Sequence, residues 1–523
     1  MHLKGMVARA GAHNGKTLKT PLTPLEPMLR GLALHAARPA VQEGRQVLSY
    51  ADLAGRSAQF ATLLLGLGLR PGGHVVLISP NTSDALLTFH AVPLAGGVIV
   101  PLNPAFGDEA LRFLLAHADP QVVLVDRAHL RRVQATLDDL RLPVVVTGAG
   151  ADLAARLRLL EPHPLEVPAG LDEDSAISVN YTSGTTSDPK GVMLTHRGTL
   201  LNLSSLLYHL DLRPGCRYLH ATPLAHGNGW GMAWAVTAAG GVHHMLPDAG
   251  GLRAALLGGG VTHVCASPAW LAPLLGGAAL RLPRPVKLLV AGVRPHSPLL
   301  STLQDQGFEV LHSYGLTETS ALLTLNGPER AEGEPLTRQG HAMTFSGQLQ
   351  VVLEDGSPVP HDGQTPGEVV IRSNQVMKGY YKNPRATRRA IKDGWLHTGD
   401  LAVVQPGGSL DILDREGDLL NLAGQPYSSA QIEAVLYRHP SVREAVVVAA
   451  PGEGGDSPCA FVTLHPGAGV EPREILSFCA PHLPPFALPG QLLLVPDLPK
   501  TASGKVLRHV LRQQARSRKT PRG

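Results

Sequence analysis

The segment Ala176–Gly191, AISVNYTSGTTSDPKG, joins a short apolar run to a loop rich in hydroxyl groups and glycine. The run has the length and composition of a buried β-strand. Comparable runs occur at 74–79, 121–126, 286–292 and 309–315, and helix-like patterns such as 50–67 separate several of them. Strands that are apolar on both faces and connected by helices are typical of mostly parallel sheets. We therefore predict an α/β fold.

The composition is that of a large globular protein. The chain has 523 residues, of which 44% are hydrophobic and 17% charged, so we expect more than one domain. The net charge of +4 is too small to indicate nucleic-acid binding. The four cysteines form no CxxC pair and are expected to be free thiols in the cytoplasm. Prolines interrupt the most apolar stretch, Ala85–Leu102, so no membrane span is predicted.

The pattern changes after residue 340, where short β segments alternate with Gly/Pro turns. A compact α+β unit follows, with a helix expected at Ser429–His439. We place a domain boundary between Asp414 and Arg415, which gives a large domain at 21–414 and a small one at 415–512. The basic ends, 1–20 and 513–523, are expected to be flexible tails, and a targeting role for the first is left open.

The loop after the first quoted strand suits a polyphosphate. Phosphate oxygens accept hydrogen bonds from hydroxyls and backbone N–H groups and attract a cation. The hydroxyls belong to Thr182, Ser183, Thr185 and Thr186, glycines that permit close approach are Gly184 and Gly191, and the cation is Lys190. A flexible polar surface loop is the alternative, and this density of donors makes it the weaker one.

The order T-S-G-T-T-x-x-P-K-G resembles the phosphate-binding loop of the adenylate-forming (AMP-binding) superfamily, in which Ser187 is often glycine. Further motifs follow in the family's order, so the resemblance covers about residues 22 to 512. It implies a large N-terminal domain of several mostly parallel α/β layers and a small mobile α+β C-terminal domain. It also implies that ATP and coenzyme A are substrates and Mg²⁺ a cofactor. Within the superfamily, it implies that the chain belongs to the acyl-CoA synthetase (fatty-acid–CoA ligase) branch.

HSYGLTETS, at 312–320, resembles the family's segment Y-G-x-T-E. On that resemblance Tyr314 stacks on adenine, Thr317 contacts the α-phosphate and Glu318 holds Mg²⁺, a cation that prefers carboxylate and phosphate oxygens. The remaining residues expected around the nucleotide are Ser313, Gly315 and Gly292.

Three later motifs complete the expected adenylation site. In WLHTGD, Asp400 would accept hydrogen bonds from the ribose hydroxyls, and Arg415 in DREGD would reach the ribose or the phosphates. Asp414 matches the hinge about which the small domain swings. In PKTASGKVLR, Lys505 would bridge the substrate carboxylate and the α-phosphate, because a mobile ammonium can hold two anions together.

The acyl pocket is expected around ATPLAHGNGWGMAW, at 221–234, which resembles a segment of bacterial acyl-CoA synthetases. His226 would line the carboxylate end and Trp230 would gate the acyl tunnel, although a core histidine and tryptophan are open alternatives. Ala225 and Gly227 offer no carboxylate to an amino group, which disfavours an amino-acid substrate. The resemblance to the fatty-acid–CoA ligase branch implies a medium- or long-chain fatty acid. The other expected lining residues are Gly231, Ala291, Val293 and Ser320.

One loop, which borders the pantetheine channel in relatives, departs from the family's pattern. Where relatives often read S-G-G, this chain has Leu422, Ala423 and Gly424. Gly424 still permits close backbone approach, and the resemblance implies CoA as the acceptor, with a carrier protein as the alternative. A non-catalytic nucleotide-binding protein is a remote alternative, and a homodimer is possible.

Overall fold

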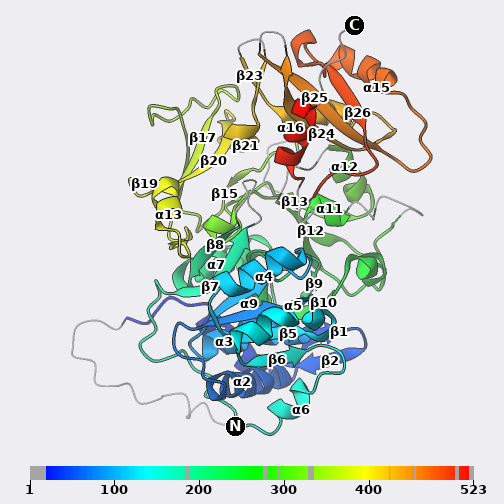
Figure 1. The fold of residues 1–523 in the computed structure, drawn as a ribbon. Helices are drawn as coiled ribbons and strands as arrows, with labels where there is room; N and C mark the ends of the chain where they lie inside the picture. The colour runs from blue at the N-terminus through cyan, green and yellow to red at the C-terminus, as the bar shows by residue number, and fades with distance from the viewer. Residues whose placement is uncertain are drawn as a thin grey trace.

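The computed structural model describes residues 19–182, 189–271, 274, 280–292, 295, 297–327, 335–422, 425–452, 455–500 and 506–517. A large body holds most of the chain, and the C-terminal segment, orange to red in Figure 1, forms a smaller body above it. Within the described residues, none of the helices combines the length and apolar character that crossing a bilayer requires.

The first sheet carries the strand that ends in the phosphate loop. Its order is β18-β8-β7-β4-β3-β5-β6, and the five strands from β7 to β6 run parallel, whereas β8 and β18 are antiparallel to their neighbours. The helices α2 to α5 gather around it (Figure 1). The elements are β3 (His74–Ile78), β4 (Val98–Leu102), β5 (Pro120–Asp126), β6 (Val144–Thr147), β7 (Ala176–Thr182), β8 (Lys190–Thr195), β18 (Gly379–Tyr380), α2 (Tyr50–Gly66), α3 (Ser83–Leu94), α4 (Asp108–His117) and α5 (Arg127–Leu140).

The second sheet has the order β13-β12-β11-β9-β10-β1-β2, and only the edge strand β2 is antiparallel. Fully buried aromatic side chains, among them Trp234 and Phe89, lie in the hydrophobic cluster beside it. The elements are β1 (Pro39–Glu43), β2 (Gln46–Ser49), β9 (Arg217–His220), β10 (Val242–Met245), β11 (His263–Ala266), β12 (Val286–Val290), β13 (Phe308–His312), α7 (His196–His209), α8 (Gly227–Trp230) and α9 (Met232–Ala239).

A third, antiparallel sheet follows residue 340, as the Gly/Pro-rich pattern predicts. β20 (Trp395–Val404) lies between β17 (Gly367–Arg372) and β19 (Ile391–Lys392) and also pairs with β21 (Leu410–Arg415). β16 (Gln348–Val352) completes the sheet. The turn between β20 and β21 uses Gly408 with φ +82°, a conformation that glycine adopts at little cost.

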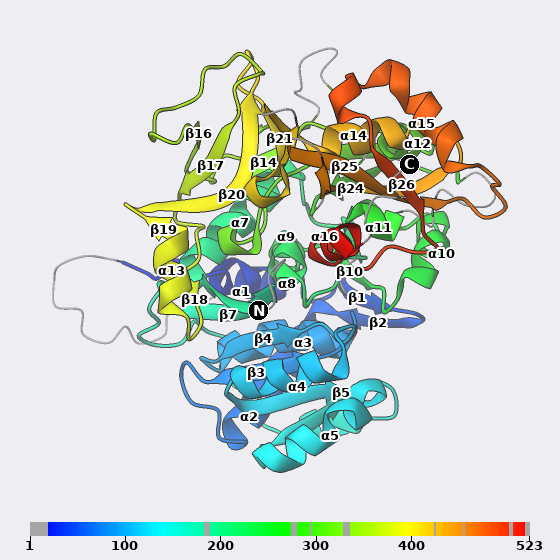
Figure 2. The same cartoon turned by 45° about the horizontal axis from the view of Figure 1, so that its top comes forward.

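The C-terminal body has its own small sheet. β24 (Val442–Gly452) pairs antiparallel with β25 (Gly455–Leu464), which runs parallel to β26 (Gln491–Leu494). Three helices pack on it, α14 (Ser429–Leu436), α15 (Pro472–Cys479) and α16 (Arg508–Ser517), and α16 lies against β24 (Figure 2). The α/β class and the separate small C-terminal unit predicted from the sequence are thus confirmed, whereas the boundary at Asp414 and Arg415 stays a prediction.

One helix is shorter than predicted. The expected helix at 429–439 ends at Leu436, and Tyr437 caps it. Pro440 follows, and a proline disfavours the helical conformation of the residue before it. The apolar face is nonetheless correct, because Ile432 and Leu436 are fully buried.

Candidate active site

Tyr314, Asp400 and Arg415 lie in one hydrogen-bonded row. Asp400 on β20 pairs in register with Arg415 on β21. The Tyr314 hydroxyl donates to Asp400 Oδ2 at 2.7 Å, and Arg415 Nε donates to Oδ1 at 3.2 Å. The sheet register thus joins Asp400 to Arg415, and the hydroxyl of Tyr314 adds the third of these separately predicted residues.

In this row the Asp400 carboxylate lies between a neutral hydroxyl donor and a positively charged guanidinium group. Burial raises the pKa of the Tyr314 hydroxyl well above its usual value, and the Asp400 carboxylate beside it adds to that shift. Burial works against the positive charge of Arg415, but the carboxylates of Asp400 and Glu318 together raise its pKa. Tyr314 therefore stays a neutral donor, and Arg415 stays charged.

Glu318 is linked to Lys190 through Tyr380. Glu318 lies in a single turn, η4 (Thr317–Thr319). Tyr380 on β18 donates its hydroxyl to Glu318 Oε1 at 2.9 Å, and Lys190 Nζ lies 5.1 Å from the centre of the Tyr380 ring. The pairing of β18 with β8 places that ring beside Lys190. Sequence reasoning missed Tyr380, since nothing local in KGYYKNP indicates this long-range pairing.

A tight turn holds the Tyr314 segment. A Cβ on Gly315 would lie 1.6 Å from the Ala321 carbonyl oxygen, so only glycine fits there. Ser320 has φ +57°, and its hydroxyl donates to the Gln375 carbonyl at 2.8 Å. Ser313 Oγ donates to the Thr324 carbonyl at 2.5 Å. These hydroxyls stabilise the turn, and the ligand contacts expected of Ser313, Gly315, Thr317 and Ser320 stay predictions.

The phosphate loop connects two antiparallel strands. Thr182 at the end of β7 pairs with Lys190 at the start of β8, and Tyr181 pairs with Gly191. A Cβ on Gly191 would lie 2.9 Å from a Val179 methyl carbon, so this glycine is also required for packing. Ser183, Gly184, Thr185 and Thr186 lie outside the described residues, as do Val293, Ala423, Gly424 and Lys505, and the roles given to them stay predictions.

The segment expected to line the acyl pocket has an unusual backbone. All five residues from Gly227 to Gly231 have positive φ, including Asn228 at +57° and the buried Trp230 at +59°. Asn228 Nδ2 donates to Ser178 Oγ on β7 at 2.8 Å, and Asn202 Nδ2 donates to the Trp230 carbonyl at 3.2 Å. These bonds help to maintain a conformation that non-glycine residues rarely adopt.

Two side chains of this segment, His226 and Trp230, contact each other. The His226 and Trp230 rings meet edge to face at 6.4 Å between centroids. Trp230 is 5% exposed and shares a hydrophobic cluster with Ala291. A Cβ on Gly231 would lie 2.3 Å from Asn202 Nδ2. Trp230 is thus buried in the core, and its role in the acyl pocket stays a prediction, as does that of Gly292 at φ +95°.

Asp414 joins the end of β21 to the start of α14. Its Oδ2 accepts hydrogen bonds from the backbone N–H of Ser429 at 3.1 Å and from the Ser429 hydroxyl at 2.5 Å. Arg508 Nη1 donates to the same hydroxyl at 3.1 Å, and its Nη2 donates to Glu433 at 2.8 Å. The proposed hinge residue is therefore bonded directly to the C-terminal body.

Two family matches cover most of the chain. The AMP-binding enzyme family matches residues 30–381, and the C-terminal domain of AMP-binding enzymes matches residues 431–505. An acetate–CoA ligase, CCL3 of Humulus lupulus, is 36% identical and is aligned over 95% of each chain. The peroxisomal acetate/butyrate–CoA ligase AAE7 of Arabidopsis thaliana is 33% identical over 95% of each chain.

Solved structures have the same fold. The anthranilate–CoA ligase AuaEII in complex with anthranoyl-AMP superposes with a TM-score of 0.87 over 96% of this chain and 98% of that one, at 23% identity. ATP-bound MatB of Rhodopseudomonas palustris superposes with a TM-score of 0.84 over 95% and 99%, at 25% identity.

The chain belongs to the AMP-binding enzyme superfamily. Within it, the chain lies in the acyl-CoA ligase branch, as the sequence motifs predicted. The predicted enzyme class, an AMP-forming acid–CoA ligase, is confirmed by the same relatives.

Proposed function

We propose that this enzyme activates a short-chain or aromatic carboxylic acid with MgATP and transfers the acyl group from the adenylate to CoA. The observation that carries the proposal is the row formed by Tyr314, Asp400 and Arg415, with Glu318 and Lys190 joined through Tyr380. The names of relatives support the acid class, since they include acetate, butyrate, benzoate and trans-cinnamate ligases.

The nucleotide would bind at this row. Each Asp400 oxygen already accepts one hydrogen bond and has capacity for another, so a ribose diol can donate to the carboxylate. The bond to Asp400 fixes the Tyr314 ring, which would stack on adenine. Arg415 stays charged beside the same carboxylate, where it can reach the ribose or a phosphate oxygen.

Glu318 fits a magnesium ion held jointly with the nucleotide. Among the described residues, Tyr380 is its single hydrogen-bond donor, which acts on Oε1 and leaves Oε2 for a cation. No cluster of three metal-ligating side chains occurs in the described part of the chain. Magnesium commonly binds one or two carboxylates together with substrate phosphates. When bound, the ion would neutralise charge on the phosphates.

The first half-reaction exchanges one phosphorus–oxygen bond for another. The acid's carboxylate attacks the α-phosphorus, and pyrophosphate leaves with the electrons of the broken bond. Lys190 and, by resemblance, Lys505 offset the negative charge that accumulates. In the second half-reaction the CoA thiolate attacks the acyl carbon, and AMP leaves. The chain needs no covalent nucleophile for either step.

The position of the Trp230 side chain favours a small acid as the substrate. If the acyl group enters beside His226, the buried indole, which belongs to the same hydrophobic cluster as Ala291, occupies the space that a long chain would need. The medium- or long-chain fatty acid expected from the sequence is the competing substrate. A panel of acetate, butyrate, benzoate, octanoate and palmitate, assayed for CoA-dependent AMP release, tests the proposal. Selective activity on the last two acids would contradict it.

The acceptor is tested in the same assay. We propose CoA, and pyrophosphate release without acyl-CoA formation would favour the carrier-protein alternative. The absence of acid-dependent pyrophosphate release across the panel would favour the non-catalytic alternative.

We further propose a cytoplasmic location. No disulfide joins any of the four buried cysteines, which suits a reducing compartment. Several relatives from Arabidopsis thaliana are named peroxisomal, so imaging a fluorescent fusion against a peroxisomal marker is the test. A homodimer is also proposed, and sedimentation of the purified enzyme tests it.

A further inference from the structure

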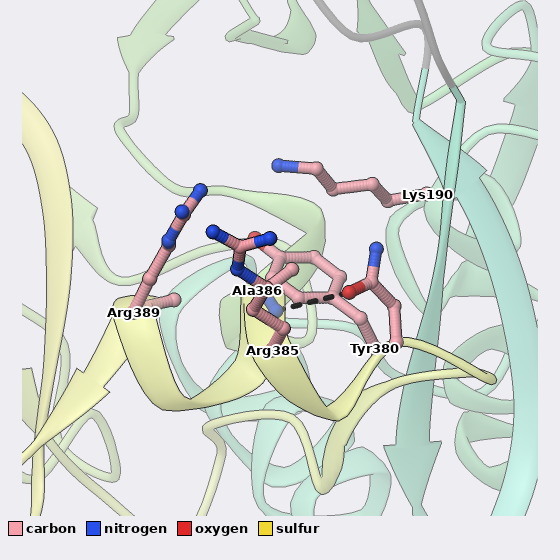
Figure 3. Close-up of a pocket in the computed structure, with 7 residues that line it drawn as sticks. Lys190, Tyr380, Arg385, Ala386 and Arg389 are labelled. Carbon is pink, nitrogen blue, oxygen red and sulfur yellow. Dashed lines mark hydrogen bonds between the residues drawn. The ribbon is translucent and has the colours of Figure 1, made fainter.

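A cavity of about 390 Å³ opens beside Lys190. It lies between the start of β8, Tyr380 on β18 and the short helix α13 (Pro384–Ala390). Figure 3 shows Lys190 extending over the Tyr380 side, while Arg385 and Arg389 rise from the helix toward the same space. Three cations from two distant parts of the chain thus face one cavity.

Among the described residues, the cations of this cavity have no anionic partner. Lys378–Lys392 contains six lysines and arginines and no acidic residue. None of the described residues that line the cavity carries a carboxylate. In the described part of the chain neither Arg385 nor Arg389 has an ion pair, whereas the neighbouring Lys382 lies 3.6 Å from Asp119. Such a cluster attracts a multivalent anion, because a bound anion offsets the mutual repulsion of the cations.

Tyr380 connects the cavity to the candidate active site. Its ring lies under Lys190 at 5.1 Å, and its hydroxyl donates to Glu318 at 2.9 Å. Lys190 also ends the phosphate loop. A diphosphate group bound in the cavity would therefore lie one side chain away from the carboxylate assigned to magnesium.

We propose that this cavity is a diphosphate site, which takes the pyrophosphate that adenylation releases. Pyrophosphate presents oxygens on both phosphorus atoms, which can accept bonds from the Lys190 ammonium and from the guanidinium groups of Arg385 and Arg389. The inference rests on the proposed function only for the origin of the pyrophosphate. Arg385 and Arg389 would determine how strongly this product inhibits the enzyme and how readily it enters the reverse reaction.

Calorimetric titration of the full-length enzyme with sodium pyrophosphate tests the site directly. The variants are Arg385→Gln, Arg389→Gln and the pair together. Arg388→Gln is the matched control, since Arg388 is exposed on the same helix and does not line the cavity. We expect each cavity arginine to contribute about tenfold in affinity, the order expected of hydrogen bonds to charged groups, and the control to stay within about twofold. AMP affinity, which reports an intact fold, should not change.

Two results would overturn the site. One is an unchanged pyrophosphate affinity in the double variant. The other is an equal loss in Arg388→Gln, which would indicate nonspecific attraction to a basic surface.

Kinetics distinguish released pyrophosphate from the β- and γ-phosphates of bound ATP. For a product site, the double variant raises the inhibition constant of pyrophosphate and leaves KM for ATP within about twofold. A parallel rise in both constants would overturn the product assignment. The calorimetry measures pyrophosphate binding without turnover, so it can detect the site even if no acid in the panel supports pyrophosphate release. Failure of the proposed function and failure of the diphosphate site are therefore distinguishable.

Discussion

The hydroxyl of Tyr314 donates a hydrogen bond to Asp400 Oδ2 over 2.7 Å, across 86 positions of sequence. Tyr314 follows β13 of the second sheet, whereas Asp400 belongs to β20 of the third. The bond fixes the proposed adenine platform to the proposed ribose acceptor.

Tyr314→Phe should therefore weaken ATP binding while it keeps the aromatic ring. Loss of a hydrogen bond to a carboxylate commonly costs about 1.5–3 kcal/mol, so we expect KM for ATP to rise about tenfold or more. The measurement is pyrophosphate release at varied ATP. Tyr208→Phe, at a side chain that is 71% exposed, is the control. An unchanged KM for ATP in Tyr314→Phe would show that this hydrogen bond does not contribute to nucleotide binding.

Gly315→Ala should disrupt the Tyr314 turn. The new methyl carbon would lie 1.6 Å from the Ala321 carbonyl oxygen, a backbone atom that cannot rotate away. We expect loss of ATP binding together with a lower Tm. Gly417→Ala is the control, since a Cβ there meets no atom within 4 Å. Wild-type ATP affinity in Gly315→Ala would show that the turn tolerates a side chain.

Trp230→Gly should shift the preference toward longer acids. Glycine adopts the φ of +59° found at this position with little strain, so the variant removes the indole and keeps the backbone. One methylene in an apolar pocket changes kcat/KM by about tenfold or more, and we expect at least that change in the ratio of octanoate to acetate. A constant ratio would place Trp230 outside the acyl pocket.

Arg508→Gln should destabilise the C-terminal body. Glu433 would lose its partner at 2.8 Å, in a pair whose Arg508 and Glu433 side chains are 20% and 13% exposed. Breaking a fully buried ion pair costs about 3–5 kcal/mol, so we expect a smaller loss here. Limited proteolysis of the region after residue 414 measures the effect. Arg516→Gln, exposed on the same helix, is the control. The paired change Arg508→Met with Glu433→Leu should restore much of the resistance, and equal cleavage of all variants would contradict the assigned role.

Buried histidines should make the large body less stable in mild acid. Burial lowers the pKa of His90 and His196 to about 4 and that of His220 to about 3. These groups stay neutral in the folded state and protonate in the unfolded state below pH of about 6.5. Their contribution to stability is therefore present above that pH and decreases as the pH falls toward about 4, by about 1.4 kcal/mol per pH unit for each histidine.

Urea unfolding between pH 7 and pH 5 measures this dependence. All four tryptophans lie between residues 230 and 395, so their fluorescence reports the large body. His196→Gln should have a smaller slope of unfolding free energy against pH than the wild type. The same slope in both proteins would show that His196 does not contribute to the pH dependence of the unfolding free energy.

Local sequence was sufficient for the strands and the nucleotide motifs. The apolar run at 74–79 forms β3 because a short β-branched segment can be buried whole between helices. The loop after β7 and the motifs at Tyr314, Glu318 and Asp400 were found from residue order. The sequence could not predict that Tyr380 contacts Glu318, because that contact depends on the pairing of β18 with β8, some 190 residues earlier in the chain.

The sequence by itself therefore determined the α/β class and the superfamily, and it predicted the separate residues of the adenylation site. Only the tertiary structure decided how those residues meet: Tyr314 bonded to Asp400, Lys190 over Tyr380, and Trp230 held at positive φ in the core. It also assembled the basic cavity from Lys190 and the arginines of α13. The physical reason is that periodicity and residue type act over a few neighbours, whereas strand register and side-chain packing set the distances between remote segments.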